Sequence, residues 1–455
     1  MRFRQIGFVL ALAALMFASS SGTAHAQGWL DDRARAEGPG IRLGDFELHP
    51  GIGLELGWDS NVYYTSDNPP PGLPGRVDSA ILRVTPHLLF STVGAQRRAE
   101  GEGAAAELPP EVQFRGGLSA SYYEFFADER RRNVGIDVGL NLTILQGRPV
   151  SFSIYNQFGR AIRPFTEITS NVSYARIQNE AGVDIVFSTP GQVLQVGVGY
   201  DFGIDFFEED QFRYANSFNH TISLRESFRF LPQTALVHTT RFRIRDYYEG
   251  VPSADRPLQV DSYRLTSMLG LNGAITNEVS FLVEGGYGAG FFEAVGPYDQ
   301  DFDSFLARAE LRWRPFEAFR LSLGYDRSFN PSFVGNYYSQ DRGYLNTQML
   351  FGGAFLLGAE VSLGYYDFGQ IVAADGMTPI GRVDGVPSTD REDIRFIGSL
   401  FAEYRFTEWL GVNGTFRYVG SFTDFAYDVP VAAVTLIDPA QYHKVELWLG
   451  VRVFY

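Results

Sequence analysis

The chain has no cysteine and, beyond its N-terminal segment, no long apolar run. Without cysteine it can form neither a disulfide nor a lipid-modified N-terminal Cys, and this suits an oxidising compartment. No later segment approaches about 18 consecutive apolar residues, which excludes a membrane-spanning helix. Basic residues are fewer than acidic ones. The resulting net charge of −15 at pH 7 argues against nucleic acid as a partner.

The N-terminal segment 1–26 is typical of a signal peptide. Two arginines precede an apolar run at 6–18, and Ala24-His25-Ala26 fits the small-x-small cleavage pattern. A retained membrane helix is the alternative, but the run is too short for one. Residues 27–44 are polar and glycine-rich. We expect them to form a periplasmic lead-in that is disordered or plug-like.

Strict alternation marks the last eleven residues. Apolar residues occupy every second position from Val445 to Tyr455, which predicts a strand with one apolar face. A transmembrane barrel needs such a strand at its end, because the last and first strands must pair to leave no open edge in lipid. We expect the partner strand near 51–63. Val451, Val453 and Tyr455 are predicted as an assembly signal, with the outer-membrane insertion machinery as partner.

The same alternation recurs throughout residues 45–455. It predicts an all-β fold, a transmembrane antiparallel β-barrel in the cell outer membrane, and the 15% aromatic and 20% charged residues suit such a barrel. The predicted strands are 46–64, 79–92, 112–126, 132–146, 150–163, 176–188, 192–206, 216–230, 234–248, 262–275, 279–293, 303–314, 319–330, 341–355, 359–372, 392–406, 410–424 and 442–455. These are about 18 strands, an even number as expected for a bacterial barrel. The long segment 93–111 leaves 16 strands as the alternative.

Connections between these strands alternate in length. Tight turns such as 147–149 and 276–278 are separated by longer loops such as 249–261, 373–391 and 425–441. This predicts short periplasmic turns and long extracellular loops.

One face of most predicted strands is apolar and the other is polar or small. A barrel of this size cannot fill its interior with side chains, so the polar face predicts a water-filled lumen unless a segment plugs it. Charges on this face are segregated along the chain. The lumen-lining candidates are Asp137, Glu180, Asp184, Asp201 and Asp205, followed by Arg225, Arg229, Arg241, Arg243, Arg245, Arg308, Arg312, Arg314 and Arg320. They predict either a field across the lumen that selects solutes or salt bridges that stiffen the wall, and both can hold.

The sequence offers little that indicates catalysis. A hydrolase needs a nucleophile with a base in reach. The nearest match to the His-x-Ser pair of barrel phospholipases is His238-Thr239-Thr240, which has Thr in place of Ser. We therefore predict no enzyme activity, no metal site and no cofactor.

The first predicted strand resembles a known family. Gly57-Trp58-Asp59-Ser60-Asn61-Val62-Tyr63 is similar to the opening strand of the β-barrel porin 2 family of Gram-negative outer-membrane barrels. The resemblance implies an outer-membrane barrel, and several relatives lie among genes for exopolysaccharide synthesis and export. Asp59 and Asn61 are matching positions, for which a turn or strand-exit role is expected.

Three functions remain open from the sequence. The first is a pore for export of a polysaccharide, which the resemblance implies together with a periplasmic export component as partner. The second is a general or anion-leaning diffusion porin. The third is a plugged structural or adhesive surface barrel. All three place the chain among outer-membrane lipid and lipopolysaccharide.

Overall fold

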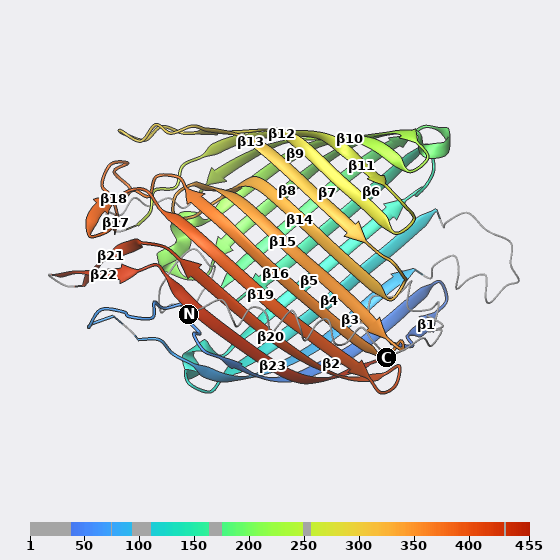
Figure 1. Cartoon of the computed structure of the whole chain (residues 1–455), viewed down its shortest axis with the longest axis horizontal. Coiled ribbons are helices and arrows are strands. Elements are labelled where there is room, and N and C mark those ends of the chain that lie inside the picture. Colours follow the sequence, from blue (N-terminus) through green and yellow to red (C-terminus); the bar gives the residue numbers. More distant parts are fainter. Residues whose placement is uncertain (1–37, 74, 93–110, 163–174, 249–255, 432–433) are drawn as a thin grey trace, which may run out of the picture.

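The alternating segments form long strands that run diagonally across a closed cylinder (Figure 1). The computed structural model describes residues 38–73, 75–92, 111–162, 175–248, 256–431 and 434–455. The barrel strands are β2 (Phe46–Asp59), β3 (Ser79–Thr92), β4 (Val112–Phe125), β5 (Asn133–Ile144), β6 (Val150–Ala161), β7 (Arg176–Ser188), β8 (Leu194–Phe207), β9 (Ser217–Leu231), β10 (Thr234–Tyr247), β11 (Ser262–Ala274), β12 (Val279–Phe292), β13 (Phe302–Trp313), β14 (Phe319–Pro331), β15 (Tyr337–Phe351), β16 (Phe355–Phe368), β19 (Glu392–Arg405), β20 (Leu410–Phe422) and β23 (Tyr442–Phe454). This confirms the prediction of an antiparallel barrel of 18 strands.

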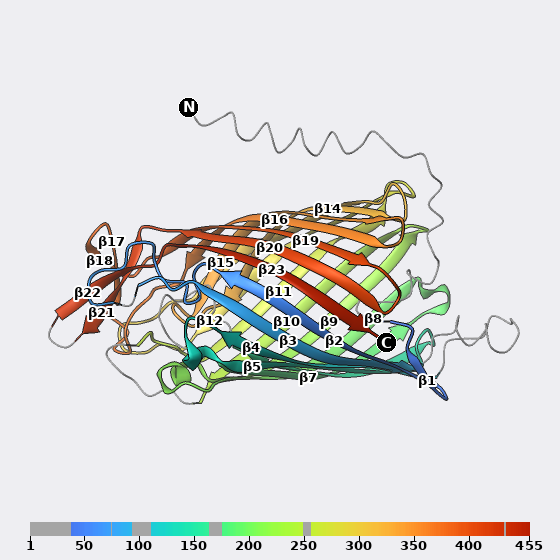
Figure 2. The same cartoon turned by 90° about the horizontal axis from the view of Figure 1, so that it is seen from below.

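The barrel closes between its first and last strands, as the C-terminal alternation predicted. β23 pairs antiparallel with β2, with Gly51 opposite Phe454 and Asp59 opposite Glu446. Figure 2 shows the two strands side by side. The backbone N–H of Tyr455 donates a hydrogen bond to the Pro50 carbonyl at 2.8 Å, so pairing continues to the last residue.

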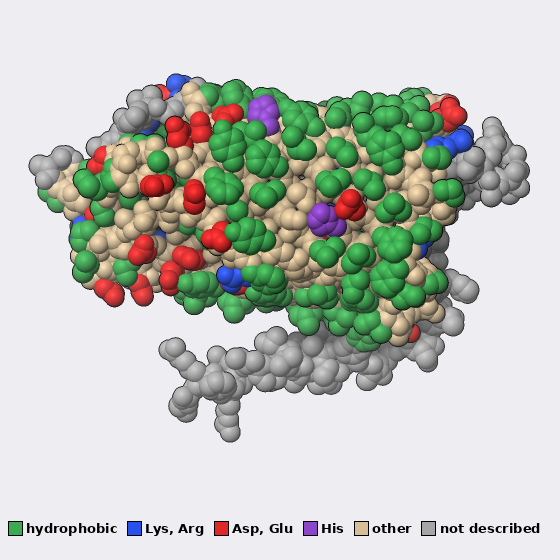
Figure 3. All heavy atoms as spheres, turned by 90° about the horizontal axis from the view of Figure 1, so that it is seen from above, with side chains coloured by type: hydrophobic (Ala, Val, Ile, Leu, Met, Phe, Trp, Pro, Cys, Tyr) green, Lys and Arg blue, Asp and Glu red, His purple; other side chains and the backbone are tan. Residues whose placement is uncertain are grey.

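The distribution of side chains is the reverse of that in a water-soluble protein. On β2, Leu54 and Leu56 are 52% and 59% exposed, whereas Glu55 between them is only 4% exposed. Figure 3 shows apolar side chains over most of the outer surface, with acidic ones gathered at one end. An apolar exterior around a closed sheet is stable only in lipid, which places the barrel in the outer membrane. No helix among the described residues is long and apolar enough to cross a membrane; only short 3₁₀ turns occur, η2 (Glu129–Arg131), η3 (Pro190–Gln192) and η4 (Asp210–Ala215).

Two predicted strands were displaced along the chain. The strands predicted at 341–355 and 359–372 correspond to β15 and β16, and each of them begins and ends four residues earlier than predicted. The turn between them is formed by Gly352 and Gly353, whose φ values of 55° and 73° lie in the left-handed region that favours glycine.

The first strand also ends earlier than predicted, at Asp59 rather than residue 64. The Asn61 side chain stops it: its Oδ1 accepts a hydrogen bond from the Thr65 N–H at 2.9 Å, and its Nδ2 donates to the Thr65 and His443 carbonyls at 2.7 and 3.1 Å. The turn role expected for Asn61 is therefore confirmed.

The two ends of the barrel differ, as predicted from the connection lengths. Short turns at one end contrast with longer connections at the other, where four additional strands extend beyond the cylinder (Figure 1). They are β17 (Gly381–Val383), β18 (Val386–Ser388), β21 (Phe425–Val431) and β22 (Val434–Pro439), which form one sheet. The expectation of plain loops at 373–391 and 425–441 was wrong, because each folds back as a hairpin and the two hairpins pair through β17 and β21.

The predicted signal peptide, most of the lead-in and the segment 93–110 lie outside the described residues. The end of the lead-in forms β1 (Ile41–Leu43), which pairs with the start of β2.

One extracellular connection folds into the barrel. The loop Ser332–Asn336 between β14 and β15, here called the plug loop, is buried, and Asn336 lines a small gap with Arg243 and Arg264 on the inner wall. Phe333 packs on Phe207 at the end of β8, with 6.0 Å between ring centroids. The loop therefore crosses the mouth of the lumen.

The plug loop holds the other extracellular connections together. Asn336 accepts a hydrogen bond from the Val260 N–H at 2.9 Å and donates to the Tyr298 hydroxyl at 3.0 Å. Burial raises the pKa of Tyr298 further above neutral pH. On its other side, Val334 belongs to an apolar cluster with Phe425 and Ala440, which flank the outer hairpin β21–β22.

Candidate functional site: the charged lumen

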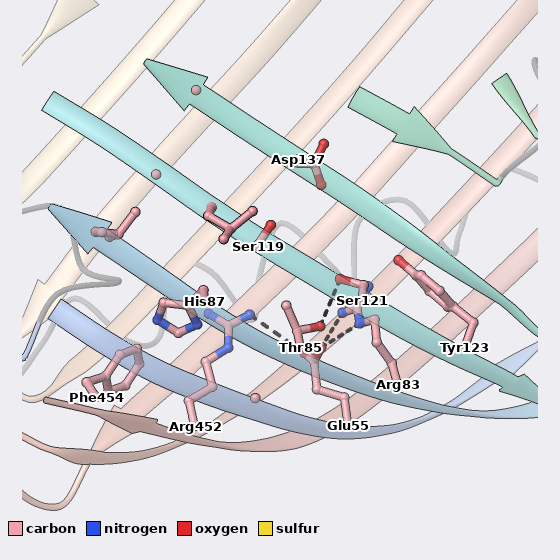
Figure 4. Close-up of a pocket in the computed structure, with 15 residues that line it drawn as sticks. Glu55, Arg83, Thr85, His87, Ser119, Ser121, Tyr123, Asp137, Arg452 and Phe454 are labelled. Carbon is pink, nitrogen blue, oxygen red and sulfur yellow. Dashed lines mark hydrogen bonds and ion pairs between the residues drawn. The ribbon is translucent and has the colours of Figure 1, made fainter. Parts of the chain in front are cut away.

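The inward faces of the strands surround two cavities of about 580 Å³ each. The first lies against β2, β3, β4, β5 and β23 (Figure 4). Its wall carries Glu55, which accepts hydrogen bonds from Arg83 at 2.6 Å and from Asn413 at 2.9 Å, and which lies 3.6 Å from Arg452. The charges around Glu55 therefore largely neutralise one another, whereas Asp137, which lines both this cavity and the second one, forms no ion pair among the described residues.

Buried ion pairs continue along the strands that close the barrel. Lys444 contacts Asp59 at 2.7 Å and Glu446 at 3.3 Å, and all three side chains are nearly inaccessible. Asp393 lies between Arg391 and Arg395 at 2.7 Å from each, with its side chain fully buried. This part of the wall is stiffened by salt bridges.

The second cavity lies against β5 to β10 and reaches Pro331 beside the plug loop. It brings together many of the predicted lumen charges. Lining residues from that prediction are Asp137, Glu180, Asp201, Asp205, Arg243 and Arg245.

The remaining predicted charges lie elsewhere on the wall. By strand alternation Asp184, Arg225, Arg229, Arg241, Arg308, Arg312 and Arg320 also belong to inward faces, outside the lining of the second cavity. Arg314 follows the end of β13 and lies in the turn to β14.

Some of these charges are paired within the inner wall. Asp184 forms an ion pair with Arg225, and Asp205 contacts both Arg176 and Arg245. Arg312 pairs with Glu310. The salt-bridge interpretation of the segregated charges therefore holds for part of the set.

Others have no such partner. Within the described part of the chain, Asp137, Glu180, Arg241 and Arg308 form no hydrogen bond or ion pair through their side chains, and all four are exposed. Their side chains are exposed and form no ion pair, which a field across the lumen requires, and that field stays a prediction.

The sequence interpretation missed Arg264 and the plug loop. Arg264 occupies an inward position of β11 and could have been found from the alternation that identified Arg243. The position of the plug loop has no periodic signal, because it depends on contacts among loops that are distant in sequence.

His238, named above for its partial match to the His-x-Ser pair, lies in a polar cluster on the outer face, and its partners Glu226 and Ser267 were not expected from the sequence. His238 lies 2.9 Å from Glu226 through Nδ1 and 3.0 Å from the Ser267 hydroxyl through Nε2. A hydrolase arranges its residues in this order. However, the backbone N–H groups of β10 and β11 belong to a continuous ladder, which leaves the strands no pair of donors for an oxyanion.

Comparisons with known proteins give only distant likenesses. No protein-family model and no curated protein matches the chain. The structure is similar to OpdQ of Pseudomonas aeruginosa, with 9% identity, coverage of 91% of this chain and 98% of that chain, and a TM-score of 0.43. It is also similar to OccK2 of Pseudomonas aeruginosa in complex with glucuronate, with 11% identity, coverage of 89% and 98%, and a TM-score of 0.42.

A third similar structure is the FrpB iron transporter of Neisseria meningitidis, with 8% identity, coverage of 91% and 82%, and a TM-score of 0.45. Likenesses at this level assign neither a family nor a solute. The resemblance to the β-barrel porin 2 family therefore remains limited to residues 57–63.

Proposed function

We propose that the chain is a non-enzymatic outer-membrane pore through which small polar solutes diffuse. The observation that carries this proposal is a lumen lined by charges, several of them unpaired, under a mouth that the plug loop narrows. Unpaired charges in a polar lumen favour solutes of opposite charge. An unpaired charge is tolerated in the wall only where water solvates it, because a buried unpaired charge destabilises the fold.

Export of a polysaccharide, the function implied by the first-strand resemblance, receives less support. A conduit for sugar chains would offer free aromatic faces along its inner wall. On the inner wall, Arg83 lies 4.4 Å from the Trp448 ring and Arg395 lies 4.5 Å from the Tyr366 ring, so guanidinium groups cover these two rings. The plug loop also lies where a continuous chain would have to pass.

Single-channel recording in planar bilayers tests the proposal with the purified full chain. We expect a small, steady conductance with a preference for anions, because unpaired Arg241 and Arg243 lie on one strand. Replacing Arg241, Arg243 and Arg245 by Gln should reduce that preference. Unchanged selectivity would contradict the role of these arginines.

A second candidate, the plugged structural barrel, is favoured by the packed plug loop itself. Asn336→Ala separates the two candidates, because it removes the hydrogen bonds to Val260 and Tyr298 that hold the loop. A pore should then conduct more than the parent chain. Absence of current from both proteins would favour the plugged barrel and reject the pore.

A further inference from the structure

Opposite charges that form no ion pair with one another line the second cavity. Asp137 on β5 and Glu180 on β7 provide carboxylates without an ion-pair partner among the described residues, and Arg243 on β10 provides a guanidinium group. Arg264 on β11 does not line this cavity, but it borders the small gap that adjoins Arg243 under the plug loop. The second cavity is therefore bordered by groups of both signs.

The basic side has more positive charge than its neighbours compensate. Arg264 is 8% exposed, and its one described partner is the Phe329 ring, 4.1 Å from the guanidinium carbon. Arg243 donates a hydrogen bond to the Thr221 hydroxyl at 3.1 Å and forms no ion pair among the described residues. Arg245 reaches Asp205 at 3.6 Å, but Arg176 contacts the same carboxylate.

Cations withdrawn from water in this way are stabilised by an anion. A guanidinium group presents a planar fork of donors that matches a carboxylate, so two such groups side by side form a strong anion site. The basic side of the cavity is therefore suited to a carboxylate.

The acidic side has the converse property. Asp137 and Glu180 have no hydrogen-bond or ion-pair partner in the described part of the chain, and both border the same cavity as Arg243. These carboxylates would repel a solute that carries negative charge alone, and would attract an ammonium group. The two sides together thus favour a solute with both charges over a simple anion.

We propose that the second cavity is a binding site for small zwitterions of the amino-acid type. The solute carboxylate lies toward Arg243, beside the gap that Arg264 borders, and its ammonium group lies toward Asp137 and Glu180. A volume of about 580 Å³ falls within the range of small-molecule sites. This proposal deepens the proposed pore function and rests on it, because the solute reaches the cavity through the lumen.

Isothermal titration calorimetry on the full chain in detergent at pH 7 tests the site. The probes are ω-amino acids from glycine to 6-aminohexanoate, each compared with the carboxylate and the amine of equal chain length. At least one amino acid should bind ten times more tightly than both of its analogues. If every carboxylate binds as tightly as its amino acid, the cavity is a plain anion site and the proposal is overturned.

Two variants test which side of the cavity binds the carboxylate of the solute and which binds its ammonium group. Arg243→Gln should weaken binding of the amino acid and of the carboxylate, each at least tenfold. Glu180→Gln should weaken the amino acid at least tenfold while leaving the carboxylate equally tight or tighter. Arg308→Gln and Glu360→Gln are matched controls, since both residues are on inward strand faces outside the cavity lining, and both should bind like the parent. Equal losses in all four variants would overturn the assignment.

The outcome is separable from that of the pore proposal. Calorimetry does not require conduction, so zwitterion binding without single-channel current would support the site and reject the pore. Current without any preference for the zwitterion would support the pore and reject the site.

Discussion

Asp393→Asn should be among the most damaging single changes outside the cavities. The Asp393 carboxylate is fully buried between Arg391 and Arg395, whose side chains are 1% and 5% exposed. Removing its charge takes away the carboxylate that lies 2.7 Å from each of the two buried guanidinium groups. Breaking a buried pair in this way typically costs about 3–5 kcal/mol. Arg391 also contacts the Tyr427 hydroxyl and the Phe368 ring, and both of these groups are neutral.

The loss is measured as the change in free energy of unfolding, from urea titrations of the barrel in lipid vesicles followed by tryptophan fluorescence. Asp210→Asn is the matched control, because Asp210 and its partner Arg213 are 83% and 50% exposed, and such pairs contribute at most about 1 kcal/mol. Adding Arg391→Gln to Asp393→Asn should recover part of the loss, because one uncompensated cation is then removed. If Asp393→Asn costs no more than the control, the buried triad does not stabilise the barrel as argued.

Three further changes have distinct expected results. Deleting residues 453–455 should prevent insertion, checked by the shift in gel mobility between heated and unheated protein; an inserted truncated chain would contradict the assembly-signal prediction. Asn61→Ala should lower the free energy of unfolding by about 1–3 kcal/mol in the same urea titration, because the buried Thr65 N–H loses its hydrogen-bond acceptor. An unchanged midpoint of unfolding would show that water replaces the Asn61 side chain. The double variant Glu226→Leu/His238→Leu should be more stable than either single one, since each single change leaves one polar partner facing lipid; additive losses would argue against coupling of this pair.

The sequence was sufficient for the strands because their signal is local and repeated. Period-two alternation also explains why the displacement of the predicted strands near residues 341–372 did not change which face each side chain was assigned to. The displacement was four residues, an even number, so every side chain stayed on its predicted face. The glycine pair Gly352-Gly353 carried the information needed to place the turn correctly.

The site was less predictable, because its properties depend on which inward groups meet. Asp184 and Glu180 are four residues apart on one face of β7, yet Asp184 is paired with Arg225 whereas Glu180 forms no ion pair among the described residues. Pairing of this kind is set by the register between strands, which alternation alone does not specify. Contacts of the plug loop with Phe207 and Ala440 link positions more than one hundred residues apart, and no local sequence pattern indicates them.

The contacts of the plug loop also bear on how much of the mouth can form before the barrel closes. Val334 shares an apolar cluster with Phe425 and with Ala440, which lies two residues before β23. Asn336 instead bonds Val260 and Tyr298, which precede it in the chain. A chain that ends before residue 425 therefore keeps the partners of Asn336 but lacks part of the cluster around Val334 as well as the closing strand.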